Sequence, residues 1–281
     1  MFVEAIKTNA PFTKQFRTIQ RRFGSQTVEK SAATMMVVNQ DGWLLTCKHV
    51  ATTILLAHKI NQQYQNYKQQ LSRGVAADAL NKTFKYAPNT TVQLKHQFFD
   101  VFKGTPKNMK IHLHKTLDLA LIHVQGDVVM QTTQYPTFSR QDVASGMMLC
   151  RLGYPFVEYT SVRYDEGQDD IFFTNEGTLN TPYFPLEGMV TRKVAQGQHV
   201  SGFEMSTPGL KGQSGGPIFD AQGLVWGIQS MTRHLDLEFK TTKETETGTH
   251  DAYAFLHVGI AVSSVEIIRF LEEHQVSFQA K

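Results

Sequence analysis

The chain has 281 residues, 41% of them hydrophobic, with 28 Lys and Arg residues against 25 Asp and Glu residues. This apolar content excludes wholesale disorder, a collagen-like repeat and a coiled coil, and the length suffices for a large core in one domain or two packed halves. The net charge of +3 has both signs interspersed, so we expect neither nucleic acid nor a membrane as partner.

The cysteines and the first residues bear on the cellular compartment. No apolar stretch approaches the roughly 20 residues that a membrane-spanning helix needs. Residues 1–14 lack the basic-then-apolar order of a signal peptide. Cys47 and Cys150 are too few for a disulfide scaffold, so we expect free thiols and a cytoplasmic protein.

Short β segments follow one another along most of the chain. They are rich in Val, Ile, Phe, Tyr and Thr, and Gly, Pro, Asn or Asp fill many of the gaps. The predicted strands are residues 31–38, 43–49, 91–101, 109–114, 117–124, 147–152, 171–175, 187–193, 200–206, 224–231 and 253–262. So many strands predict β-sandwiches or β-barrels rather than alternating βαβ units.

Two segments have helical spacing instead. Apolar residues recur three or four positions apart from Leu56 to Leu71, and Gly74 follows, which predicts a helical insertion at about 52–83. Its glutamine-rich side is either a solvated face or a docking surface. Ser263 and Glu266 form a capping box that opens a C-terminal helix over 263–274.

The polar stretch TTKETETGTHD at residues 241–251 predicts a loop between the last two β segments. It holds one glycine and no run of apolar residues. We therefore expect it to lie outside both the strands and the core.

The sharpest local pattern is GQSGGP at residues 212–217. A nucleophilic hydroxyl needs a tight turn that substrate can approach, and glycine permits such backbone angles without a side chain in the way. The backbone N–H groups of Gly212 and Ser214 would then form an oxyanion hole. The alternative is an ordinary Gly-Gly-Pro turn in which the serine has no catalytic role.

Two further segments favour the catalytic interpretation. TCKHV places His49 at the end of a predicted strand, and DLALI places Asp118 at the start of another. A serine hydroxyl is a poor nucleophile until a neighbouring imidazole takes its proton, and an acid must fix the tautomer of that imidazole. We therefore predict a triad of His49, Asp118 and Ser214.

The chain resembles the chymotrypsin-type serine proteases in the order of these three residues and in the motifs TCKHV, DLALI and GQSGGP. It is more similar to the trypsin-like, HtrA-like peptidases of bacteria. We expect no PDZ domain after the protease. Weaker likenesses lie at residues 153–155, 187–191, 223–230 and 259–262. The resemblance spans about residues 31–271, but it is specific only at the motifs and short segments named above.

The resemblance implies an all-β fold of two packed antiparallel β-barrels within one protease unit, 1–281. The first barrel would cover 12–135, with the helical insertion after the catalytic histidine, and the second 145–262. It implies a serine endopeptidase that acts through an acyl-enzyme on a protein or peptide substrate. It requires no cofactor and no metal.

Departures from the secreted relatives concern activation and specificity. Gln213 stands where they carry the aspartate that pairs with a new N-terminus, so activation by that ion pair is not expected. Pro208 stands where relatives that cleave after Lys or Arg carry an acid. The resemblance assigns substrate binding to Ser230, Met231 and Thr232, and we expect a small or medium apolar side chain before the scissile bond.

Other interpretations stay open at this stage. Lys211 and His234 would line the mouth of the channel and favour acidic residues, or simply be solvent-exposed. His112 and His114 alternate on one strand and could bind a metal, although no third ligand is evident. The chain could also be a protease-fold scaffold, a protease that an activating protein partner switches on at residues 210–213, or an esterase with the same triad.

Overall fold

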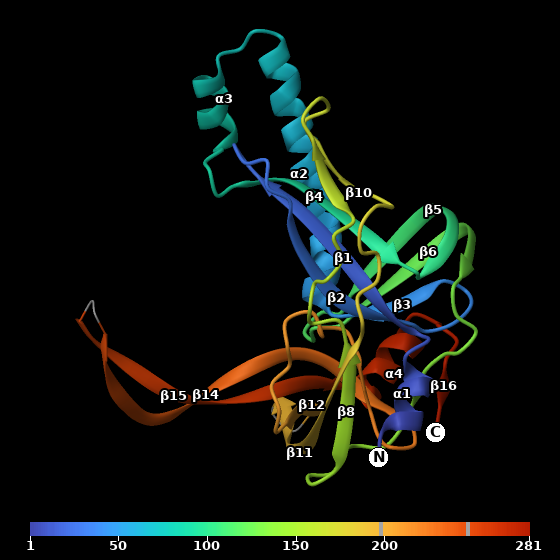
Figure 1. Ribbon diagram of the computed structural model, residues 1–281. Helices are drawn as coiled ribbons and strands as arrows, with labels where there is room; N and C mark the ends of the chain where they lie inside the picture. Colours follow the sequence, from blue (N-terminus) through green and yellow to red (C-terminus); the bar gives the residue numbers. More distant parts are fainter. Residues whose placement is uncertain (197–198, 246–247) are drawn as a thin grey trace.

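A computed structural model describes residues 1–196, 199–245 and 248–281 of the chain. Two curled β-sheets lie one above the other, and a helical arm and a long β-ribbon project from them (Figure 1). The architecture confirms the predicted all-β class with two barrel-like sheets and a C-terminal helix. No helix in the described part of the chain is long and apolar enough to cross a membrane.

The first barrel is a six-stranded sheet in the order β4-β1-β2-β3-β6-β5, with every neighbouring pair antiparallel. Its strands are β1 (Thr13–Arg22), β2 (Glu29–Val37), β3 (Trp43–Thr46), β4 (Thr91–Phe99), β5 (Phe102–Leu113) and β6 (Ala120–Met130). Strand β1 is absent from the sequence prediction because its buried positions include Lys14, Arg17 and Arg21. The Arg17 guanidinium is buried by stacking 3.4 Å from the centre of the Phe99 ring.

The second barrel is built on an eight-stranded sheet in the order β13-β8-β11-β12-β15-β14-β7-β16. An extra pairing of β13 with β14 closes six of these strands into a ring. The strands are β7 (Thr137–Phe138), β8 (Met148–Gly153), β11 (Phe184–Gln196), β12 (His199–Met205), β13 (Pro217–Phe219), β14 (Val225–Thr245), β15 (Gly248–Ser263) and β16 (Gln279–Ala280). Buried Phe203, Ile218 and Trp226 pack inside this ring.

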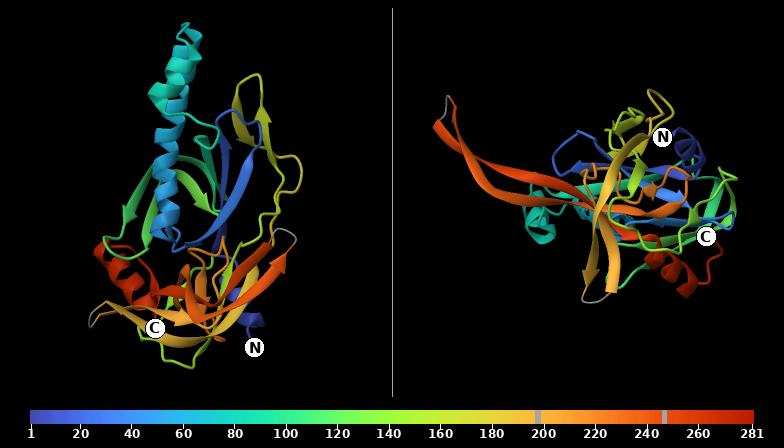
Figure 2. Two further views of the ribbon diagram at one scale, coloured as in Figure 1. Left: turned by 90° about the vertical axis from the view of Figure 1, so that its left-hand side faces the viewer. Right: turned by 90° about the horizontal axis from the view of Figure 1, so that it is seen from below.

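The helical insertion consists of α2 (Lys48–Ser72) and α3 (Ala77–Phe84). Helix α2 begins directly after β3 and stands along the outside of the first barrel (Figure 2). Its buried Tyr64 and Tyr67 pack with Leu80 and Val92, so this aromatic face holds the arm to the barrel. A separate two-stranded sheet, β9 (Val162–Asp165) and β10 (Asp170–Phe173), lies against the same region.

The ribbon corrects one sequence prediction. Residues 241–245 and 248–251 continue β14 and β15 and pair with each other, so the loop predicted at 241–251 is wrong there, while 246–247 lie outside the described residues. Figure 2 shows the ribbon running clear of both barrels. Residues 241–251 contain no apolar residue, so this end of the ribbon lacks the alternating apolar pattern from which strands are predicted.

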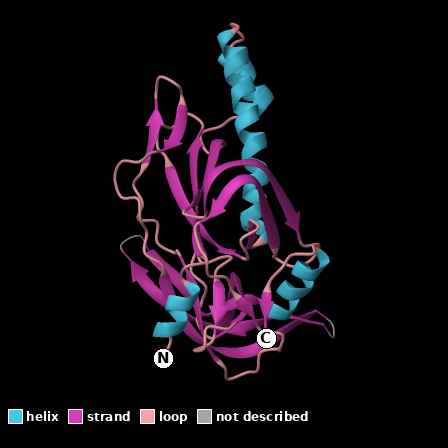
Figure 3. Cartoon of the chain, turned by 90° about the vertical axis from the view of Figure 1, so that its right-hand side faces the viewer, coloured by secondary structure: helices cyan, strands magenta, loops and turns pink. Residues whose placement is uncertain are grey.

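Two short helices lie beside the second barrel (Figure 3). They are α1 (Val3–Asn9) and α4 (Ser264–Glu273). The Ser263 hydroxyl accepts a hydrogen bond from the backbone N–H of Glu266, which confirms the predicted helix start. Buried Ile267 and Phe270 of α4 join the hydrophobic cluster that contains Leu44 of β3, so α4 ties the two barrels together.

Candidate active site

His49 and Asp118 come together because their flanking strands pair. Strand β3 is antiparallel to β6, with Thr46 opposite Ala120. The residues that follow β3 therefore lie beside those that precede β6. His49 does not end a strand, as the sequence suggested, but lies in the first turn of α2, and Asp118 lies two residues before β6.

The Asp118 carboxylate receives hydrogen bonds from both barrels. His49 Nδ1 lies 2.9 Å from Oδ2, and the backbone N–H of His49 donates to Oδ1 at 3.0 Å. The hydroxyl of Ser230, on β14, donates to Oδ2 at 2.6 Å. Burial disfavours the charged carboxylate, but the hydrogen bonds from His49 and Ser230 outweigh it and hold the pKa of Asp118 below its usual value.

Ser214 lies in the glycine-rich turn that precedes β13. Its hydroxyl donates to the backbone carbonyl of Ser230 at 3.2 Å. Ser214 and His49 line the same cavity, of about 310 Å³, on the seam between the barrels. The structure therefore joins His49 to Asp118 by hydrogen bonds and brings Ser214 to the same cavity, without a hydrogen bond to His49 among the described residues.

A β-bulge gives Ser230 its contacts with both Asp118 and Ser214. The register of β14 on β15 shifts between Gln229 and Met231, which leaves Ser230 out of the ladder. Its hydroxyl turns to Asp118 and its carbonyl to Ser214. The resemblance predicts only a substrate-binding role for Ser230. Its contact with Asp118 leaves no pattern in the sequence, because the two residues lie in different barrels.

The turn around Ser214 leaves two backbone donors available. Gly212 has a φ of +104°, and a Cβ there would lie 2.4 Å from the Tyr154 carbonyl oxygen, so this position requires glycine. Within the described chain the N–H groups of Gly212 and Ser214 donate no hydrogen bond, whereas that of Gln213 donates to the Leu210 carbonyl at 3.0 Å. The two N–H groups predicted to form the oxyanion hole are thus the ones in this turn that remain free to bind a substrate oxygen.

The loop that carries these donors is held by Gln213 and Thr34. Gln213 is fully buried; its Oε1 accepts the Leu210 N–H at 3.0 Å and its Nε2 donates to the Phe184 carbonyl at 3.2 Å. From the first barrel, the Thr34 hydroxyl donates to the Gly212 carbonyl at 2.7 Å. Thr34 gives no signal in the sequence, since it lies 178 residues from Gly212 in a strand with no recognisable motif.

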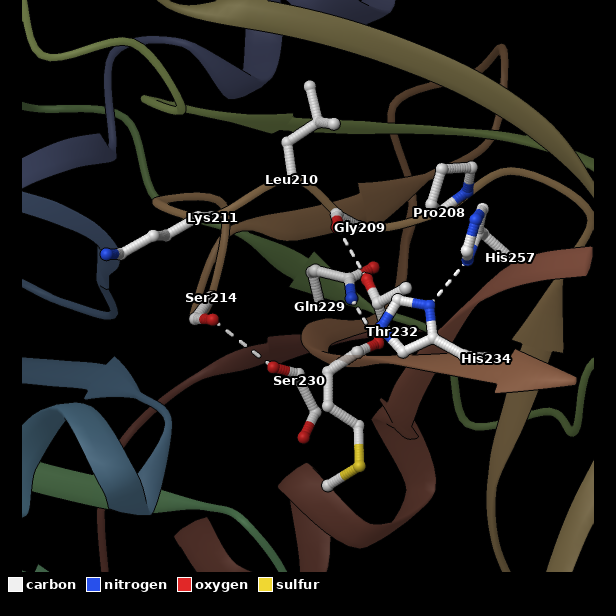
Figure 4. A pocket seen from close by; sticks show the side chains of 11 residues that line it. Pro208, Gly209, Leu210, Lys211, Ser214, Gln229, Ser230, Thr232, His234 and His257 are labelled. Carbon is white, nitrogen blue, oxygen red and sulfur yellow. Dashed lines mark hydrogen bonds between the residues drawn. The ribbon is translucent and has the colours of Figure 1, made fainter. Parts of the chain in front are cut away.

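A second cavity, of about 450 Å³, opens on the other side of Ser214. Ser230, Met231 and Thr232 line it together with Ser214, so the residues predicted for substrate binding share one pocket. Figure 4 shows this pocket between Ser214 at one end and the rings of His234 and His257 at the other. The hydroxyl of Thr232 donates to the Gly209 carbonyl at 2.5 Å.

One trio near the site has the residue types of metal ligands, and each of its side chains already bonds to a protein group. Cys47, His49 and Asp118 place their ligand atoms within 4.8 Å of one another in the described chain. Burial, and next the charge of Asp118, raise the pKa of Cys47 well above its usual value, so the sulfur stays a neutral thiol that donates to the Gln229 carbonyl. Cys47 and Cys150 are both free and buried.

The two histidines predicted to alternate on one strand have other contacts: His112 lies in β5, and His114 is the residue after it. The ring of His112 packs against that of His274, with centroids 4.4 Å apart. His114 Nδ1 accepts the backbone N–H groups of Thr116 and Leu117 and so fixes the turn after the strand. This turn leads directly into Asp118, which gives His114 a structural role.

Comparisons with known proteins relate the chain to peptidases. The family model for the trypsin-like peptidase domain matches residues 33–228. Among solved structures, a variant of the HtrA-type protease AlgW with a tripeptide has 14% identity and a TM-score of 0.48, and the match covers 98% of this chain and 65% of that one. The Rv3671c protease from M. tuberculosis in its active form has 12% identity and a TM-score of 0.48, with 99% and 86% covered. No curated protein sequence matches the chain.

Proposed function

The chain belongs to the trypsin-like peptidase family and is a serine protease, and we propose that it is an endopeptidase whose triad is His49, Asp118 and Ser214. The observation that carries the proposal is the Asp118 carboxylate, which holds His49 Nδ1 at 2.9 Å beside a cavity that His49 shares with Ser214. This is the arrangement that an imidazole base needs in order to activate a serine hydroxyl.

In the proposed reaction Ser214 Oγ turns from the Ser230 carbonyl toward Nε2 of His49 and attacks the scissile carbonyl carbon. His49 takes the hydroxyl proton and then gives it to the leaving amine, while Asp118 holds the proton on Nδ1 and stabilises the imidazolium. The negative oxygen of the tetrahedral intermediate lies between the N–H groups of Gly212 and Ser214. Water then hydrolyses the acyl-enzyme, again with His49 as the base.

Hydrogen bonds fix the loop at residues 210–213, which favours an active enzyme over a protease-fold scaffold. Gln213 satisfies both ends of its amide with the backbone, and Thr34 ties the Gly212 carbonyl to the first barrel. The donors of the oxyanion hole are therefore oriented before substrate arrives, which is the preorganised state that stabilises a developing charge. An activating protein partner would have to act on this same loop.

We propose a protein or peptide substrate and a cytoplasmic location, with no part for nucleic acid, a membrane, a metal or a cofactor. The two free, buried thiols support the compartment, because disulfides persist mainly in oxidising compartments. Fractionation of cells that produce the protein tests this; recovery in an exported fraction would contradict it.

Labelling with a fluorophosphonate probe tests the triad. Ser214→Ala should abolish labelling and lower peptidase turnover by several orders of magnitude, and Asp118→Asn should lower kcat by about 10⁴-fold. Ser72→Ala, at an exposed serine in α2, is the matched control and should label normally. Wild-type activity in Ser214→Ala would refute the triad. Turnover of simple esters but of no peptide in a cleavage library would favour an esterase.

A further inference from the structure

The pocket of about 450 Å³ beside Ser214 indicates which substrate side chain the enzyme prefers. We infer that it binds the side chain of the residue before the scissile bond, and that this residue is acidic, so that the enzyme cleaves after Glu or Asp. The inference rests on the proposed endopeptidase function. It differs from the apolar preference expected from the sequence.

The position of the pocket identifies which substrate residue it receives. Ser214 separates two cavities, and the one that holds His49 and Gly212 lies on the leaving-group side, since His49 must protonate the amine. The other cavity lies along Ser230 and Thr232. At the bulge the Ser230 carbonyl faces Ser214, where it can accept an N–H group of an extended peptide. The side chain next to the scissile carbonyl then enters this second cavity.

Two imidazoles lie at the far end of the pocket. His234 on β14 and His257 on β15 are directly opposite each other, and their Nδ1 atoms are 2.5 Å apart. One Nδ1 must therefore donate a proton to the other, which leaves the two Nε2 atoms for a ligand. In the neutral pair one of the two Nε2 atoms carries a proton, and a carboxylate can accept a hydrogen bond from it.

A buried cation lies behind the pocket wall. Arg151, on β8, has no exposed surface, and its Nη2 donates to the carbonyl and hydroxyl oxygens of Thr207, the residue before Pro208 at the pocket rim. A Cβ at Gly259, which pairs with Thr232, would lie 2.6 Å from Arg151 Nη1. Nε and Nη1 have no hydrogen-bond partner among the described residues. Burial lowers the pKa of Arg151 to about 10, so the group stays charged at neutral pH.

The one charged side chain that lines the pocket among the described residues is basic. Lys211 lines both cavities next to Ser214. The Asp118 carboxylate lies behind Ser230, where His49 and Ser230 already occupy it. The nearest acidic residue along β14, Asp236, lies outside the lining, and its carboxylate accepts the Glu238 N–H. Lys211 at the pocket and Arg151 behind its wall are cations with no ion-pair partner among the described residues, and an anionic substrate side chain supplies a counter-charge.

A matched set of peptidyl phosphonate probes tests the inference. The probes differ only in the group that mimics the residue before the scissile bond: Glu, Asp, Gln, Val or Lys. We expect the Glu or Asp probe to label Ser214 at least about ten times faster than the Gln, Val and Lys probes. Faster labelling by Gln, Val or Lys would overturn the acidic preference and leave the triad intact. If neither these probes nor a fluorophosphonate labelled Ser214, the proposed function itself would fail, and the inference with it.

Variants at the histidines separate specificity from catalysis. His234→Ala and His257→Ala should each lower the rate constant for the acidic probes by about tenfold and change that for the Val probe by less than about threefold. His58→Ala, at an exposed histidine on α2, is the matched control and should leave every rate unchanged. Equal losses for acidic and Val probes in His234→Ala would show that the pair supports the fold rather than recognises a carboxylate.

Discussion

The hydroxyl of Ser230 donates a 2.6 Å hydrogen bond to Oδ2 of Asp118, so that a bulge in the second barrel orients a carboxylate carried by the first. Asp118 thereby has His49 on one side and Ser230 on the other, and little of its side chain, 18%, is exposed. The contact makes the relative position of the barrels part of the geometry of the proposed triad.

Removal of this hydroxyl should slow catalysis without abolishing it. In Ser230→Ala the carboxylate keeps both bonds from His49, so we expect kcat to fall about tenfold, against about 10⁴-fold for Asp118→Asn. Ser230→Thr keeps a hydroxyl and is the matched control. Steady-state kinetics on one peptide substrate measures all three. An unchanged kcat in Ser230→Ala would show that His49 alone orients Asp118.

Thr34 provides a test of the oxyanion loop from outside the site. Thr34→Val removes the hydroxyl that donates to the Gly212 carbonyl at 2.7 Å and accepts the Tyr154 N–H at 3.2 Å. Freed from this bond, the Gly212 peptide can turn its N–H away from the oxyanion, so we expect kcat to fall by about 10- to 100-fold with KM nearly unchanged. Thr34→Ser keeps the hydroxyl and should remain close to wild type. An increase in KM alone would place Thr34 in substrate binding.

Activity should not depend on a free N-terminus. The side chain of Met1 is 88% exposed, and the buried Gln213 amide bonds to Leu210 and Phe184 instead. A short Ser-Gly extension before Met1 should therefore change kcat/KM by less than about twofold. Gln213→Leu, which cannot make either amide bond, should lower kcat by about 10-fold or more. If the extension abolished activity, a terminal ion pair would have to organise the loop.

The Asp118 network should stabilise the fold at neutral pH and weaken in acid. The pKa of Asp118 is lower in the folded state than its usual value of 3.8, so the unfolded state binds its proton more readily. The stabilisation is present above about pH 4 and is lost as the pH falls through the folded-state pKa. Below about pH 4 the free energy of unfolding should fall more steeply for the wild type than for Asp118→Asn. Denaturant titrations between pH 3 and 7 measure this difference, and parallel curves would contradict it.

The sequence by itself determined the fold class, the helical insertion, the C-terminal helix and the candidate triad. These features have local causes: alternating apolar residues, helical spacing, a capping serine and a glycine-rich turn around Ser214. Strand β1 escaped prediction because its buried positions carry Lys14, Arg17 and Arg21, whose burial depends on partners such as the ring of Phe99. The outer end of the ribbon escaped it because residues 241–251 contain no apolar side chain that could alternate with polar ones.

Only the tertiary structure decided how the site is held together. The contacts of Ser230 with Asp118 and of Thr34 with Gly212 join residues 112 and 178 positions apart, and the pairing of His234 with His257 depends on the register of β14 on β15. The unpaired charge of Arg151 behind the pocket likewise exists only once β8 is enclosed. A linear pattern records which groups a chain contains and which are neighbours along it. Hydrogen bonds and electrostatic fields depend on distance in space, and packing of the two barrels sets that distance.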